Sequence, residues 1–120
     1  MSTEPADILR DALLLLRREG WAKYGWLTPR GYCVEGAIDH VVAGQHRLIG
    51  LPLIEAEAGC WPFVYRAIDS LFPDRLGRAD TIPTFNTHAA TTFGDVEQML
   101  EKAIAMAEED VCEGPLPSAD

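Results

Sequence analysis

Apolar residues recur every three or four positions in four segments of this chain, and this periodicity constrains the fold more than any other feature. The four segments cover residues 5–19, 32–43, 63–72 and 92–107. Each has an apolar stripe on one side and charged residues on the other, as helices around a shared core do. The pattern predicts an all-α fold: a single compact domain of about four main helices joined by long loops.

Several helix ends are marked in the sequence. Gly20 is suited to end the first helix, and Pro62 is expected to stand at the start of the third, where proline is tolerated. Residues 53–58 then form at most a turn or two before that proline. Thr92 followed by Asp95 resembles a capping box, with Asp in place of the usual Glu, and predicts where the last helix begins.

The remaining segments are expected to be loops and a tail. Residues 20–32 and 73–91 are predicted as loops, with a short extended piece around 81–85. Residues 1–107 are expected to form the helical domain. Residues 108–120 are acidic and rich in Pro and Gly, so we expect a flexible C-terminal tail.

Composition narrows the function classes. A chain of 120 residues is the size of one domain, and a formal net charge of −9 argues against direct nucleic acid binding. No apolar run approaches the roughly 20 residues that span a membrane, and the N-terminus has no basic segment typical of a signal peptide. Three cysteines without a CxxC pair favour a reducing, cytoplasmic location.

Cys33, at the expected N-terminus of the second helix, allows two interpretations. The helix dipole favours a thiolate, and His88 as base with Asn86 as orienting group would then complete a thiol-dependent hydrolase or transferase. Alternatively, Cys33 joins Gly36 and Ala37 in a smooth patch of small residues against which another segment packs. We favour packing, so the sequence leans away from an enzyme.

The loops carry a second set of candidate residues, which could line a ligand groove or cap the ends of a small core. The candidates for ligand binding are Trp21, Tyr24, Trp26, Tyr32, Phe85 and Asn86.

Metal and cofactor sites are not expected. The histidines and cysteines lack the spacing that zinc sites usually show, and the sequence has no glycine-rich phosphate-binding loop. The acid pairs Glu35/Asp39 and Glu55/Glu57 are interpreted as solvated helix faces.

Several short motifs together resemble a family of small uncharacterised proteins, a domain of unknown function common in actinobacteria. The motifs are Gly20-Trp21, Cys33-x-x-Gly36-Ala37, Phe85-Asn86 and Thr92-x-x-Asp95-Val96. In the family pattern, Trp stands where this chain has Phe85, Asp where it has Thr87, and Arg where it has Thr91. The resemblance implies a fold and brings no activity with it.

The leading hypothesis is a helical binding or accessory module that acts through a groove between loops 20–32 and 82–91. Its partner would be a protein or a small molecule, with no membrane and no direct nucleic acid binding, and a homodimer is compatible with the exposed aromatic loop. The thiol-dependent enzyme is the alternative. An acidic mimic of nucleic acid is a third hypothesis, which requires carboxylates spaced along one surface.

Overall fold

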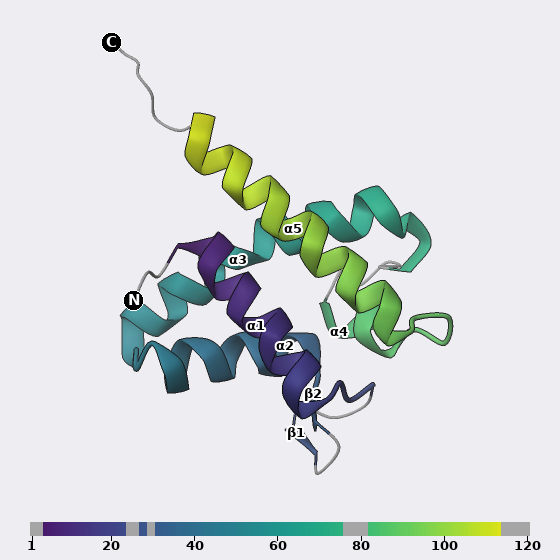
Figure 1. The fold of residues 1–120 in the computed structure, drawn as a ribbon, viewed down its shortest axis with the longest axis horizontal. Coiled ribbons are helices and arrows are strands. Elements are labelled where there is room, and N and C mark those ends of the chain that lie inside the picture. Colours follow the sequence, from purple (N-terminus) through teal and green to yellow (C-terminus); the bar gives the residue numbers. More distant parts are fainter. Residues whose placement is uncertain (1–3, 24–26, 29–30, 76–81, 114–120) are drawn as a thin grey trace.

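A computed structural model describes residues 4–23, 27–28, 31–75 and 82–113 (Figure 1). Its main helices are α1 (Pro5–Glu19), α2 (Val34–His40), α3 (Gly50–Leu71) and α5 (Phe93–Glu113), with the short helix α4 (Ile82–Thr87) between the last two. A π-helical turn, Val41–Gln45, extends α2, and a 3-10 turn, Pro73–Arg75, follows α3. The prediction of an all-α fold with four main helices is confirmed.

Helix α1 lies at the centre of the packing, against α2, α3 and α5, and α3 also packs against α5 (Figure 1). Its apolar stripe supplies much of the core, while Leu14 faces solvent. The side chains of α1 buried in this core are Ala6, Ile8, Leu9, Ala12, Leu13, Leu15 and Leu16. Burying aliphatic side chains contributes about 1.5–3 kcal/mol each, so this stripe is a principal source of stability.

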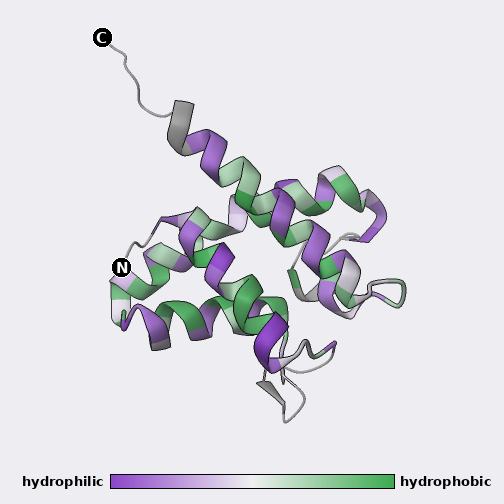
Figure 2. Cartoon of the chain, in the orientation of Figure 1, coloured by the Kyte–Doolittle hydropathy of each residue, from purple (hydrophilic) through white to green (hydrophobic). Residues whose placement is uncertain are grey.

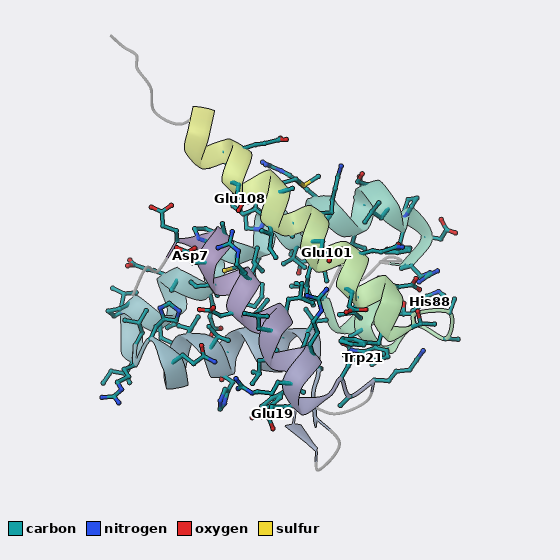
Figure 3. The ribbon with its side chains drawn as sticks, in the orientation of Figure 1. Asp7, Glu19, Trp21, His88, Glu101 and Glu108 are labelled. Atoms are coloured by element: carbon teal, nitrogen blue, oxygen red, sulfur yellow. The ribbon has the colours of Figure 1, made fainter. Side chains whose placement is uncertain are left out.

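The α1–α5 contact is bordered by ion pairs. Arg17 on α1 donates to Glu97 at 2.8 Å and to Glu101 at 3.1 Å on α5, and Arg10 donates to Glu108. Figure 3 labels Glu101 and Glu108, which lie along α5. These pairs are partly exposed, and such pairs contribute little individually. The ion pair between Arg10 and Glu108 lies beyond residue 107, where the helical domain was expected to end. Helix α5 continues to Glu113, although a tail was expected from residue 108.

Helix α3 corrects one prediction. It runs unbroken through Pro62, where the sequence predicted a helix start. Proline has no backbone N–H, so the carbonyl four residues earlier, that of Ala58, has no hydrogen-bond donor within the helix. Pro62 and Ala58 are both exposed, so water can bond to that carbonyl and the helix continues.

Two segments predicted as loops contain regular structure. The extended piece expected around residues 81–85 is wrong for the described residues, because 82–87 form α4 with Pro83 in its first turn, where its missing N–H costs nothing. Within 20–32, strands β1 (Leu27–Thr28) and β2 (Gly31–Tyr32) form a small antiparallel hairpin.

The hairpin is held against the end of α1. Gly20 ends α1 as expected, and its carbonyl accepts a bond from Tyr32 N at 3.1 Å. A Cβ on Gly31 would lie 2.1 Å from the Gly20 oxygen, and Gly31 has a φ of +134°. Only glycine fits this approach of two backbones.

Candidate functional site

Cys33 is the N-cap of α2. Its Sγ accepts a hydrogen bond from the N–H of Gly36 at 3.2 Å, and the residue is buried, with 8% of its surface exposed. Burial raises the pKa of the Cys33 thiol, although the Gly36 N–H opposes this shift. The helix N-terminus was expected to lower the pKa and favour a thiolate, but desolvation raises the pKa by more.

His88 lies in the turn between α4 and α5, at the end of the molecule where Figure 3 also labels Trp21. Its Nδ1 accepts from the N–H of Ala90 at 3.1 Å, and its backbone bonds to Phe85 and Thr91. Within the described residues, no hydrogen bond joins His88 to Cys33. The geometry therefore does not assemble the base and nucleophile that the thiol-enzyme alternative needs.

Asn86, on α4, uses its whole amide inside the protein. Its Oδ1 accepts from Trp21 Nε1 at 2.8 Å and from Val34 N at 3.0 Å. Its Nδ2 donates to the carbonyls of Ala22 at 3.1 Å and Lys23 at 2.8 Å. All four bonds that an asparagine amide can make are satisfied, and the side chain is 2% exposed. Asn86 thus joins α4, the loop after α1 and the start of α2.

The aromatic candidates mostly turn inward. Phe85 is fully buried against Phe72, and Trp21 stacks on Phe93 with ring centroids 6.2 Å apart. Tyr32 is half-buried beside His40. Tyr24 and Trp26 lie outside the described residues. The described members of the predicted groove therefore close the end of the core.

The start of α5 is fixed by the predicted capping box. Asp95 N bonds to Thr92 Oγ1 and Thr92 N to Asp95 Oδ2, both at 3.2 Å. Arg75 adds bonds to Asp95 at 3.0 Å and to Thr91 Oγ1 at 3.1 Å. This end of the domain is thus held by reciprocal polar contacts.

A cluster of carboxyl groups between α2 and α3 was not expected from the sequence. Burial, together with Asp39 and Glu35, raises the pKa of Glu57 to about 8. Burial and the charge of Asp39 also raise the pKa of Glu35. The interpretation of Glu35, Asp39 and Glu57 as solvated faces is wrong, because it ignored the approach of α3 to α2. In the described part of the chain, no group of three or more acidic, histidine or cysteine side chains is placed to hold a metal ion.

Three of the large apolar side chains that are exposed in the described part of the chain gather where α3 begins. Ile49, Leu51 and Ile54 are 79%, 64% and 59% exposed. With the exposed residues Pro52 and Ala58 they form what we term the α3 apolar surface. Figure 2 shows hydrophobic (green) turns at this start of α3, near the start of α1.

An open pocket of about 370 Å³ adjoins the α3 apolar surface. It lies between the start of α1, the segment before α3 and the first turns of α3. Its lining residues are Pro5, Leu48, Pro52, Glu55, Ala56 and Gly59. Sequence analysis missed this site because it predicted at most a turn or two of helix at residues 53–58, and so short an apolar segment does not indicate whether its side chains are buried or exposed.

Among the described helices, none is long and apolar enough to span a membrane. Comparison with curated proteins and with solved structures gives no match. A family model matches residues 1–106, and the chain therefore belongs to a family of unknown function, DUF6197.

Proposed function

We propose that this protein is a non-catalytic binding module that takes up a segment of a partner protein on the α3 apolar surface. One observation carries the proposal: three large aliphatic side chains, Ile49, Leu51 and Ile54, are mostly exposed within six consecutive positions and adjoin a pocket. Single exposed hydrophobics such as Leu14 need no explanation, whereas a contiguous patch marks an interaction site.

The two alternatives receive less support. A thiol enzyme needs a reactive Cys33, and this thiol is buried with a raised pKa. A nucleic acid mimic needs free carboxylates in a regular array. Here Glu97, Glu101 and Glu108 pair with arginines, and the carboxyl groups near Glu57 cluster between two helices. Free, buried Cys33 and Cys60 are consistent with the cytoplasmic location that we propose.

A peptide-library selection tests the proposal. Peptides enriched on the immobilised protein should perturb the backbone amide NMR signals of Leu51, Ile54 and Gly59. Ile54→Glu should weaken their binding more than tenfold, because it places a charge in the apolar contact. Leu71→Glu is the matched control: it changes an exposed leucine at the far end of the same helix and should leave binding unchanged. Peptides that bind equally to the Ile54→Glu variant would contradict the proposal.

A further inference from the structure

We infer that the pocket beside the α3 apolar surface receives a lysine or arginine side chain from an amphipathic helical segment of the partner. This inference rests on the proposed function and specifies the partner's chemistry. It is carried by the pocket lining, by the lack of an ion-pair partner for Glu55 among the described residues, and by the glycine at position 59.

The pocket has apolar walls and one carboxylate. Pro5, Leu48 and Pro52 contribute apolar wall, and of the described residues that line the pocket only Glu55 is charged. Lysine and arginine have the matching chemistry, since each carries a methylene stem that packs on apolar surface and a cationic end. A neutral aliphatic side chain would fill the same walls but leave the carboxylate without a partner.

Glu55 has no ion-pair partner within the described part of the chain, in contrast to the carboxylates on α5 that pair with Arg10 and Arg17. It is exposed and lies one turn after Leu51, so the two share one face of α3. A cation bound at Glu55 would therefore sit beside the apolar contact. The formal net charge of −9 adds long-range attraction for a basic segment and opposes a second copy of this chain.

Gly59 keeps the pocket open. It lies inside α3, where glycine costs about 1 kcal/mol relative to alanine. Packing within the chain does not require glycine here, because a Cβ would meet only Pro5 Cγ, at an ordinary 3.7 Å. The backbone is also helical, without a positive φ. The space over Gly59 therefore belongs to the pocket, and we assign it to the stem of the incoming side chain.

The partner segment is expected to be helical. Leu51, Ile54 and Ala58 follow one another at three- and four-residue spacing along α3, so they form a ridge that another helix can pack against. An amphipathic helix would place aliphatic side chains on this ridge and its basic residue in the pocket.

The test is a charge-swap selection with a random helical peptide library, run in parallel on the native protein and on the Glu55→Lys variant. Both proteins should select aliphatic residues at helical spacing. The native protein should also select Lys or Arg at one position on that face, and the variant should select Asp or Glu there. For a selected lysine peptide, Glu55→Gln should weaken binding about fivefold, while a norleucine version of the peptide should be insensitive.

Gly59→Leu gives a second, independent measurement. It should fill the pocket, weaken the lysine peptide about tenfold and leave α3 folded, as checked by circular dichroism. The inference would be overturned if the native protein selected peptides for the α3 apolar surface without favouring Lys or Arg, or if the Glu55→Lys variant still favoured Lys or Arg. Either result would leave the proposed function standing. If the native chain self-associates through Ile54 and selects no basic peptides, the inference is also overturned, with a second copy as the occupant. Peptides that perturb the amide signals of the protein only outside the α3 apolar surface and its pocket would contradict both the inference and the proposed function.

Discussion

Replacing Asn86 with alanine should cost this domain a large part of its stability. The substitution removes the hydrogen bonds that the Asn86 amide makes to four groups: the indole N–H of Trp21, the backbone N–H of Val34 and the carbonyls of Ala22 and Lys23. The bonds to Val34 N and Ala22 O are buried, and each buried group left without a partner costs about 1–3 kcal/mol. The other two are partly buried and can recruit water. We expect a total loss of about 3–5 kcal/mol, where small domains have about 5–15 kcal/mol in all.

Asn86→Asp separates the roles of the two halves of the amide. The aspartate keeps the shape and can still accept from Trp21 and Val34, but it turns a carboxylate oxygen toward the two carbonyl groups. This contact disfavours the charged form and should raise the pKa of the introduced carboxyl in the folded state. The folded variant then binds a proton more readily than the unfolded one, so its deficit relative to the native protein should shrink as pH falls.

Urea denaturation followed by circular dichroism between pH 4 and 8 measures both effects. Gln98→Ala, at an exposed position on α5, is the control and should change stability by less than about 0.5 kcal/mol. The indole N–H signal of Trp21 should move in both Asn86 variants, because it loses or changes its acceptor. An Asn86→Ala variant that loses less than about 1 kcal/mol would refute the assignment of Asn86 as the junction of these segments.

Three further predictions concern individual residues. Gly31→Ala should destabilise the fold by about 3 kcal/mol in urea denaturation, given the 2.1 Å approach to Gly20; a loss below about 1 kcal/mol would count against that approach. Cys33 should be alkylated by iodoacetamide only when the protein unfolds, measured peptide by peptide by mass spectrometry, and rapid native labelling would revive the thiol enzyme. Glu57, with its pKa raised from 4.5 to about 8, adds stability below pH 4.5 that is lost as pH rises toward 8. Glu57→Gln should remove about 2 kcal/mol of the pH dependence of stability. This is less than the free energy that corresponds to the whole pKa shift, because Glu57 is only partly buried. A variant whose stability depends on pH as in the native protein would exclude this contribution of Glu57.

Local signals in the sequence predicted much of the helical framework. The stripe of α1, its end at Gly20 and the capping box at Thr92 each depend on neighbours within a few residues, and the structure confirms them. Pro62 misled the prediction, because local rules place proline at a helix start, whereas exposure of the freed carbonyl permits it inside a helix. Residues 82–87 misled it as well, since the residue before a proline favours extended backbone and the neighbouring threonines are β-branched.

The sites depended on contacts between distant segments, which no local pattern encodes. Asn86 was predicted as a candidate catalytic or ligand-binding residue, but its bonds to Trp21 and Val34 require the assembled fold. The raised pKa of Glu57 likewise depends on the proximity of this residue of α3 to Asp39 and Glu35 of α2. The exposure of Ile49 and Ile54 was not predictable, because it depends on which elements of the fold pack against the start of α3.

The most direct test of the binding-module account maps selected peptides by NMR on the native protein and on the Ile54→Glu variant. The account predicts signal changes confined to the start of α3 around Leu51, Ile54 and Gly59, and their loss in the variant. Binding that survives Ile54→Glu, or signal changes centred on His88 and the start of α5, would contradict it.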